Sequence, residues 1–481
     1  MPNLIHYLDF QAKRHPQRLA LSYGNSSFSF LQLQQLVKSL AKKLRASGVK
    51  PGQIVSTQLN NPPLHVAMTL ALLHEATVSC SVADHLEIPS EVPVDFYLID
   101  PDHLGCTIPA EKCLLIDTPW IESAVSKTSN EEAHDYDFDN SLCRLILSSG
   151  TTGTPKAIPI THTTLASRCF RRGNLEPQLG CELSFFDVCS SIGFYAIFKP
   201  LLTGLPLALP FSYEHSLADL NRLKISNLGG SPNHLTELMQ FVKSPPPNHL
   251  QLISTAGSLV GVNLINQIKT HLCPNIISRY GSSETSTMAI CSGEDLLRHS
   301  GAAGFVLPEN QLQIVDEFFM PVPSGEAGLI GVKTPDMATE YFNNAKATGE
   351  HFIDGWFYPG DIGCQREDGL LVLEGRQSDV INLGGVKVNP NTIDHLLLEQ
   401  SGIIDCATIG LANALGIEEL FTAVVVQADT RASKLSELIV SQLPPIYNTT
   451  KLITLKTIPR NAAGKLIRVQ LKEALRHFLP K

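Results

Sequence analysis

The chain has 481 residues, of which 43% are hydrophobic and 17% charged, and its formal net charge is −9. This composition excludes a disordered chain, and the length predicts roughly two or three domains. The negative charge gives no basis for binding nucleic acid or an anionic membrane surface. The 11 cysteines are scattered, without C-x-x-C pairs or zinc-like spacing, so we expect free thiols in a reducing compartment.

The N-terminal part of the chain is predicted to belong to the α/β class. A short strand is expected at residues 19–23, and amphipathic spacing predicts a helix over 30–44. Over residues 52–210, and again over 225–290, short apolar runs alternate with helical patterns, which is typical of largely parallel sheets covered by helices. Residues 311–375 contain short strands separated by Gly and Pro turns, which predicts a small antiparallel, barrel-like sheet.

The pattern changes after Arg376. The elements expected there are helices at 390–400, 433–442 and 466–478 and strands at 406–411, 422–427 and 451–455. They predict a compact α+β unit, so we place one domain over residues 1–376 and a smaller one over 377–481. We see neither a secretory signal nor a run that could span a bilayer, and a cytoplasmic protein without a transmembrane segment is therefore the default expectation.

A glycine- and threonine-rich loop follows the apolar strand that ends at Leu147. Its glycines allow tight turns with inward-pointing N–H groups, and its hydroxyls and its lysine add donors, which suits the oxygens of a phosphate. The spacing of a Walker A loop is absent, and this disfavours a kinase or P-loop NTPase. A flexible linker is the alternative interpretation. The predicted phosphate-binding residues are Ser148, Ser149, Gly150, Thr151, Thr152, Gly153 and Lys156.

This loop resembles the most characteristic motif of the ANL superfamily of adenylate-forming enzymes, which includes acyl- and aryl-CoA synthetases, peptide-synthetase adenylation domains and luciferases. Further motifs follow in the family's order as far as residue 468, and the opening segment around His15-Pro16 is also similar to the family's start. The resemblance implies a large N-terminal adenylation domain of α/β layers with a β-barrel-like subdomain. It also implies a small, mobile α+β C-terminal lid domain that carries a catalytic lysine. ATP and Mg²⁺ are the implied cofactors.

The second motif reads Tyr-Gly-Ser-Ser-Glu-Thr over residues 280–285. An aromatic ring can stack on a purine, and a glutamate beside hydroxyls can hold a magnesium ion that neutralises polyphosphate charge. The resemblance implies that Tyr280 packs against adenine and that Ser283 contacts the α-phosphate or the carboxylate. It implies that Glu284 holds Mg²⁺, with Gly281 and Ser282 beside the nucleotide. The family usually has threonine where Ser283 stands, and the hydroxyl is kept.

Three later segments complete the resemblance. Asp361, on a Pro-Gly turn, is implied to bind the ribose hydroxyls, and Arg376 to reach ribose or phosphate. Ser378 aligns with the family's hinge, where Asp or Lys is usual. Lys465, in the segment Pro-Arg-Asn-Ala-Ala-Gly-Lys, is implied to be the catalytic lysine of adenylation. Such a charge would bridge the carboxylate and the α-phosphate in the transition state, with Glu284 and Ser283 as the other catalytic groups.

The acyl pocket is less clearly marked. The candidate lining residues are Ser191, Phe194, Tyr195, Gly230, Gly257 and Ser258. Plain core packing is the alternative for the two aromatic residues. Amino-acid-activating relatives have an aspartate where Ser191 stands, so an α-amino acid is less favoured. Many relatives have glycine at the position of Ser286, and the larger serine suggests a narrower tunnel for aryl or short acyl groups.

The sequence thus predicts an AMP-forming acid–thiol ligase. A small-molecule carboxylic acid is activated by ATP to an acyl-adenylate with release of pyrophosphate, and the acyl group passes to a thiol. The acceptor is expected to be coenzyme A, as in acyl- or aryl-CoA synthetases. The alternative is a stand-alone enzyme that loads an acyl, aryl or amino acid onto the phosphopantetheine arm of an acyl or peptidyl carrier protein. A luciferase-like oxygenase and a non-catalytic adenylate-binding protein are less favoured.

Overall fold

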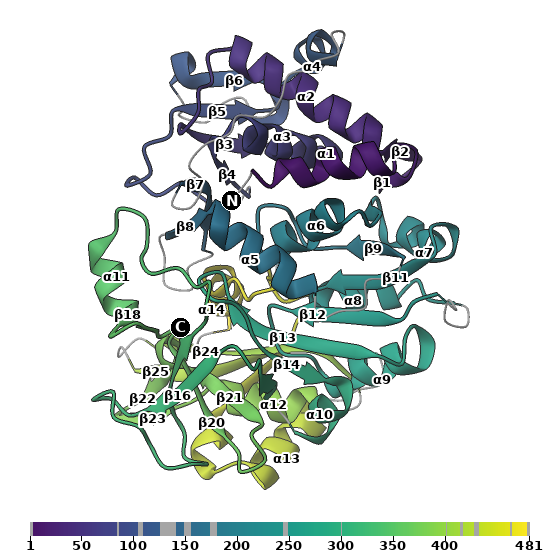
Figure 1. Cartoon of the computed structure of the whole chain (residues 1–481). Helices are drawn as coiled ribbons and strands as arrows, with labels where there is room; N and C mark the ends of the chain where they lie inside the picture. Colours follow the sequence, from purple (N-terminus) through teal and green to yellow (C-terminus); the bar gives the residue numbers. More distant parts are fainter. Residues whose placement is uncertain are drawn as a thin grey trace. The chain divides into compact units, whose positions relative to one another are not determined.

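The computed structural model describes residues 3–83, 86–103, 109–125, 141–148, 155–173, 180–243, 249–299, 301–400, 402–413, 417–427, 432–461 and 464–478. The chain forms two compact units, whose elements are labelled in Figure 1. The first unit holds residues 1–229 and 336–350, and the second holds 230–335 and 351–481. The boundary predicted at residue 377 falls inside the second unit and stays a prediction.

The first unit contains a six-stranded sheet in the order β6-β5-β3-β4-β7-β8. These strands are β6 (Cys113–Leu115), β5 (Phe96–Ile99), β3 (Ile54–Gln58), β4 (Val78–Ser81), β7 (Leu142–Leu147) and β8 (Ala157–Thr161). All neighbours are parallel except β7 and β8, which form an antiparallel pair from Leu142↔Thr161 to Leu147↔Ala157. Continuous apolar runs such as Leu145-Ile146-Leu147 are buried, as expected for strands covered on both faces.

Five more strands, which lie in the first unit except for the last residue of β11, follow the order β11-β9-β10-β1-β2. They are parallel except for the terminal pair of β1 and β2. They are β11 (Ile225–Gly230), β9 (Cys181–Ser184), β10 (Leu207–Leu209), β1 (Leu19–Tyr23) and β2 (Ser26–Ser29). The helices of this unit include α1 (Ile5–Arg14), α2 (Phe30–Ala46), α3 (Pro62–His74), α4 (Thr118–Val125), α5 (His162–Gly173), α6 (Ser191–Thr203) and α7 (Tyr213–Arg222). The alternation of strands and helices predicted for residues 52–210 is confirmed.

Local sequence signals explain where these helices begin and end. Helix α2 starts with a capping box, because Ser29 accepts from the N–H of Gln32 while the Gln32 side chain accepts from the N–H of Ser29. Helix α6 is capped by Ser190 and stops at Gly204, whose φ of 84° lies in the left-handed region. The segment 345–350 in the first unit belongs to α11 (Ala345–His351).

The second unit continues with helices and strands and then an antiparallel region. Its first elements are α8 (Pro232–Met239), β12 (Leu252–Ala256), α9 (Val262–His271), β13 (Ile276–Ser282), β14 (Ser286–Ser292), α10 (Gly293–Arg298) and β15 (Ala302–Val306). The antiparallel strands that follow are β16 (Gln311–Val315), β17 (Gly328–Lys333), β18 (Phe352–Ile353), β19 (Trp356–Phe357), β20 (Asp361–Gln365) and β21 (Leu371–Arg376). The small antiparallel sheet predicted over 311–375 is confirmed.

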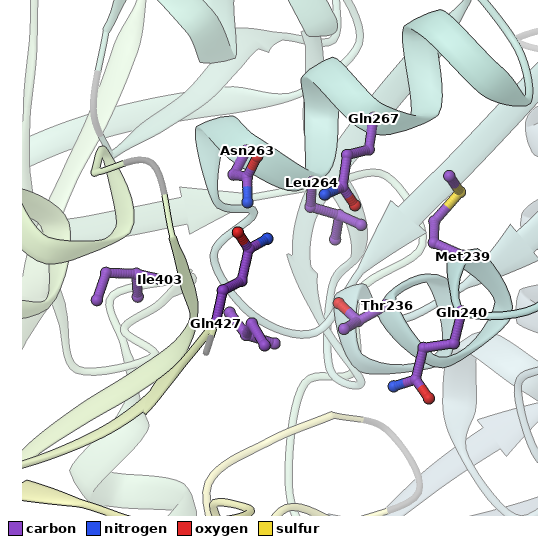
Figure 2. Close-up of a pocket in the computed structure, with 9 residues that line it drawn as sticks. Thr236, Met239, Gln240, Asn263, Leu264, Gln267, Ile403 and Gln427 are labelled. Carbon is purple, nitrogen blue, oxygen red and sulfur yellow. The ribbon is translucent and has the colours of Figure 1, made fainter. Parts of the chain in front are cut away.

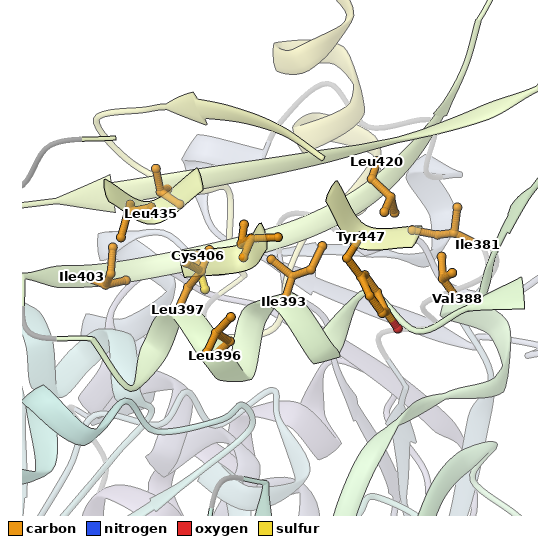
Figure 3. Close-up of a cluster of buried hydrophobic side chains, with 12 residues drawn as sticks. Ile381, Val388, Ile393, Leu396, Leu397, Ile403, Cys406, Leu420, Leu435 and Tyr447 are labelled. Atoms are coloured by element: carbon orange, nitrogen blue, oxygen red, sulfur yellow. The ribbon is translucent and has the colours of Figure 1, made fainter. Parts of the chain in front are cut away.

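The C-terminal part of the second unit has the predicted α+β composition. Its elements are β22 (Ile381–Leu383), β23 (Val386–Val388), α12 (Asn391–Leu398), β24 (Ile403–Ala412), β25 (Glu418–Val426), α13 (Ala432–Gln442), β26 (Lys451–Thr454) and α14 (Arg468–Arg476). Figure 3 shows its core, in which Ile393 and Leu397 of α12 lie against Ile403 and Cys406 of β24. Because these clustered side chains all come from this region, it has a hydrophobic core of its own. Burying each such side chain contributes about 1.5–3 kcal/mol.

Partly buried Asp394 of α12 carries an expected pH dependence. Its carboxylate accepts a hydrogen bond from Thr408 Oγ1 (2.6 Å), and burial raises its pKa from 3.8 to about 6 against the opposing effect of Thr408. Because the folded-state pKa is the higher one, its contribution to stability is present below about pH 4 and is lost as the pH rises through about 6. As the pH rises from 4 to 7, we expect the urea midpoint of Asp394→Asn to increase relative to that of the wild type. A pH-independent difference between the two proteins would contradict this assignment.

No disulfide joins the ten cysteines in the described part of the chain. Among the described residues, no helix is both long and apolar enough to cross a membrane.

Candidate functional site

The predicted ribose-binding aspartate lies at the meeting point of three strands of the second unit. Asp361, the first residue of β20, is the register partner of Arg376, the last residue of β21. Its carboxylate accepts from Arg376 Nε (2.8 Å) and from the hydroxyl of Tyr280 on β13 (2.8 Å). Burial, followed by the charge of Asp361, raises the pKa of the Tyr280 phenol well above its ordinary value, so Tyr280 remains a neutral donor. Three residues predicted from separate motifs are thus joined directly.

The motif of residues 280–285 ends in the turn, residues 283–285, between the antiparallel strands β13 and β14. Gly281 is required there, because a Cβ atom would lie 2.0 Å from the carbonyl oxygen of Ser286. The hydroxyls of Ser282 and Thr285 contact each other at 3.1 Å and tie the turn together. Glu284 is buried, while Ser283 is half-buried. Ser286 adopts a left-handed φ of 62°, a backbone conformation that glycine adopts more readily than serine.

Lys465 lies close to Glu284, Asp361 and Arg376. Burial lowers the pKa of its ammonium, and Arg376 lowers it further, while Glu284 and Asp361 act in the opposite direction. No hydrogen bond to the Lys465 ammonium is present among the described residues. The second unit therefore brings together the predicted catalytic lysine, the predicted magnesium ligand and the predicted ribose-binding pair. A carboxylate that meets phosphate oxygens is a typical Mg²⁺ ligand set, so Glu284 fits the implied ion.

The loop of Lys465 packs against residues predicted to line the acyl pocket. Gly464 has a φ of 80°, and a Cβ added to it would lie 2.7 Å from Ser231 Cβ and 3.8 Å from Ser258 Oγ. Ser231 follows Gly230, the last residue of β11, and Ser258 follows Gly257 just after β12. Predicted pocket residues and the catalytic loop thus meet within the second unit.

The close packing of Gly464 predicts the result of a single substitution. We expect Gly464→Ala to lower acid-dependent pyrophosphate exchange at least tenfold, because a left-handed alanine costs about 1–2 kcal/mol and its methyl group would displace the loop from Ser231. Gly325→Ala is the matched control, since Gly325 has a similar φ of 85° but no neighbour within 4 Å. Equal activity of the two variants would show that the packing of Gly464 is unimportant.

The predicted phosphate loop joins the two antiparallel strands β7 and β8 of the first unit. The N–H of Ser148 donates to the carbonyl of Lys156 (2.8 Å), and the N–H of Lys156 donates to Ser148 Oγ (3.1 Å), so these residues close the base of the loop. The Lys156 ammonium lies over the ring of Tyr341 at 4.9 Å. The other loop residues of the prediction lie outside the described residues: Ser149, Gly150, Thr151, Thr152 and Gly153.

The remaining predicted pocket residues lie on α6 of the first unit. Ser191 begins the helix, and Phe194 and Tyr195 are each 2% exposed. The ring of Phe194 packs under the guanidinium of Arg144 (4.1 Å), and the Tyr195 hydroxyl accepts from Arg168 Nη1 (3.4 Å). Sequence reasoning missed both buried arginines. A charged residue inside the apolar run 142–147 was the available signal for the first of them.

A cavity of about 260 Å³ lies elsewhere in the second unit. Figure 2 shows its labelled walls, which come from α8, α9 and the ends of β24 and β25. The lining residues are Thr236, Met239, Gln240, Asn263, Leu264, Gln267, Ile403, Ile404 and Gln427. It contains none of the residues predicted from the motifs.

The sequence pattern of one family, described as AMP-binding enzyme, matches residues 8–87 and 99–342, which is more than half of the chain. The chain belongs to this family. This AMP-binding enzyme is 25% identical over 486 aligned residues to a 2-succinylbenzoate–CoA ligase of Bacillus cereus, covering 98% of each chain. It is also 25% identical to the 2-succinylbenzoate–CoA ligase of Bacillus subtilis, covering 96% of each.

Solved structures share the fold of this AMP-binding enzyme. O-succinylbenzoate coenzyme A synthetase from Bacillus subtilis, in complex with AMP, superposes with a TM-score of 0.83 at 24% identity over 98% of each chain. ATP-bound MatB from Rhodopseudomonas palustris gives a TM-score of 0.87 at 20% identity over the full length of both chains. The predicted fold class, a large N-terminal α/β domain with a smaller C-terminal domain, is therefore confirmed.

Proposed function

We propose that this AMP-binding enzyme is an acid–thiol ligase that adenylates a small carboxylic acid and transfers the acyl group to coenzyme A. The observation that carries the proposal is the grouping of Lys465 with Glu284, Asp361 and Arg376. The Lys465 ammonium and the buried Glu284 carboxylate thus lie beside the hydrogen-bonded residues Tyr280, Asp361 and Arg376. The polar groups of these three residues suit a ribose. The full-length similarity to CoA ligases supports the same activity.

The first half-reaction requires two anions to meet. An oxygen of the substrate carboxylate attacks the α-phosphorus of ATP, the bond to the β-phosphate bridging oxygen breaks, and pyrophosphate leaves. Negative charge accumulates on the α-phosphate, so a nearby ammonium such as Lys465 stabilises the transition state. Mg²⁺, when bound at Glu284, would neutralise the polyphosphate. Positioning and charge stabilisation are the main tasks of the protein in such a reaction.

In the second half-reaction, the thiol sulfur of coenzyme A attacks the acyl carbon of the adenylate, the acyl–oxygen bond breaks and AMP leaves. We infer that the C-terminal domain moves about Ser378 between the two steps. Ser378 is exposed and lies in the short turn Gln377–Asp379, between β21 and β22. A few residues between packed elements can absorb the dihedral changes of such a motion.

Proline at the hinge should separate the two half-reactions. We expect Ser378→Pro to retain pyrophosphate exchange within a few-fold but to lower thioester formation from supplied acyl-adenylate at least tenfold, because proline restricts φ. Ser378→Ala is the control, because it removes the hydroxyl without restricting φ. An equal loss of both half-reactions would count against the hinge.

The acid is proposed from the relatives. Since the similar proteins are named for 2-succinylbenzoate, an aryl acid bearing a short acyl chain is our first candidate. The deciding experiment is pyrophosphate exchange with the purified protein across aryl, short-chain and amino acids, followed by AMP release with coenzyme A. Exchange with an acid but no thioester with coenzyme A would redirect the proposal to a carrier-protein thiol. No exchange with any acid would contradict the proposed function.

A further inference from the structure

The backbone around Lys465 is held by a closed set of hydrogen bonds. The N–H of Lys465 donates to Asn461 Oδ1 (2.9 Å), and the N–H of Asn461 donates to the Lys465 carbonyl (2.9 Å). The N–H of Gly464 donates to the Asn461 carbonyl (2.8 Å), and Arg460 pairs with Leu466 as an antiparallel bridge. These bonds hold Asn461, Gly464 and Lys465 to one another, but they do not fix the place of these residues on the domain.

Arg460 connects this loop to β24, an edge strand of the three-stranded C-terminal sheet. Its guanidinium donates to both carboxylate oxygens of Asp405 on β24, from Nε (2.9 Å) and from Nη2 (2.7 Å). The remaining nitrogen, Nη1, donates to the carbonyl of Gly464 (3.1 Å), the residue before the lysine. The side chains of Arg460 and Asp405 are only 15% and 23% exposed. A planar guanidinium held at two oxygens has a fixed orientation, so its third contact places the Gly464 carbonyl.

We propose that Arg460, oriented by Asp405, is the positioning residue that places the Lys465 ammonium for adenylation. This inference rests on the proposed role of Lys465 in the first half-reaction. The lysine ammonium has no hydrogen bond among the described residues, so its location depends on the loop that carries it. A displacement of about 1 Å in such a group can lower a rate by about a hundredfold. The thiol step uses no charge from Lys465, and it should not depend on Arg460.

The ion pair of Lys451 and Glu419 offers a matched comparison. It joins β26 to β25 in the same three-stranded sheet, and among the described residues no hydrogen bond or ion pair links it to the lysine loop. Its loss should therefore report any general weakening of the C-terminal core. Arg460→Gln, Asp405→Asn and Lys451→Gln each remove one member of an ion pair from this sheet.

The test measures three quantities for each variant: pyrophosphate exchange, thioester formation from supplied acyl-adenylate and coenzyme A, and melting temperature. We expect Arg460→Gln and Asp405→Asn to lower the kcat of exchange by about tenfold to a hundredfold, with the thioester step within twofold of wild type. Arg460→Lys should recover part of the exchange. Lys451→Gln should leave both steps unchanged. Adding Arg460→Gln to Lys465→Ala should cause no further loss of exchange.

Two results would overturn the inference. Wild-type exchange in Arg460→Gln would show that the loop needs no such contact. Equal loss of exchange and thioester formation, or a further loss in the Lys465→Ala background, would show a general structural role. These outcomes differ from failure of the proposed function, in which the wild-type protein itself shows no exchange with any acid.

Discussion

Replacing Lys465 with alanine is expected to lower acid-dependent pyrophosphate release by about a hundredfold or more, which corresponds to on the order of 3 kcal/mol of transition-state stabilisation. The ammonium lies near Glu284 and Asp361 and has no hydrogen bond among the described residues, so it is available to the reacting anions. The substitution should leave ATP binding and the melting temperature nearly unchanged. Thioester formation from supplied acyl-adenylate should also persist, because that step forms no pentacovalent phosphate.

Lys456→Ala is the matched control for this prediction, since Lys456 is an exposed lysine nine positions earlier in the same part of the chain. Pyrophosphate release should be followed directly, with ATP binding measured by calorimetry on the same preparations. If Lys465→Ala released pyrophosphate at the rate of Lys456→Ala, the assignment of the catalytic lysine would be wrong.

Replacing Asp361 with asparagine should produce the second large effect. The carboxylate accepts from Arg376 and from Tyr280, and it is proposed to accept from the ribose hydroxyls in the complex. Hydrogen bonds to a charged group contribute about 1.5–3 kcal/mol each, so losing the two ribose bonds should lower kcat/KM for ATP by about a hundredfold or more. The change should appear mainly as a higher KM for ATP, because ribose contacts are present in both ground and transition states.

Asp354→Asn is a suitable comparison, because Asp354 is exposed and its φ of 51° is tolerated by asparagine. Initial-rate kinetics at varied ATP would separate kcat from KM. A melting temperature measured in parallel would detect any loss of stability, since Arg376 would lose its carboxylate partner. An unchanged KM for ATP in Asp361→Asn would contradict the ribose assignment.

The strands and helices were predictable from the sequence because their signals are local. The apolar run 142–147 is the strand β7, and the amphipathic run 30–44 is most of helix α2. Ends were less certain, as in the predicted helix 466–478, which begins at Arg468. There the helix starts two residues later because Leu466 is still paired with Arg460 as an isolated bridge.

The candidate site was predictable only in part, because its motifs are recognisable but their contacts are not local. The roles of Tyr280, Asp361 and Arg376 followed from family motifs, whereas their mutual hydrogen bonds depend on the pairing of β20 with β21 and on the position of β13. No sequence pattern marked Asp405 as the partner of Arg460, which is 55 residues away. The contact of the buried Arg144 guanidinium with the ring of Phe194 was also missed, although a charged residue inside the apolar run 142–147 was an available signal.

The sequence by itself determined the fold class, the order of the motifs and the chemical groups that an adenylating enzyme needs, since these depend on residue type and on short-range spacing. Only the tertiary structure decided which of those groups meet. The register of β20 against β21 places Asp361 opposite Arg376, and the left-handed Gly464 allows the lysine loop to pack on Ser231. Both results arise from backbone pairing and close packing between distant segments, which residue spacing does not specify.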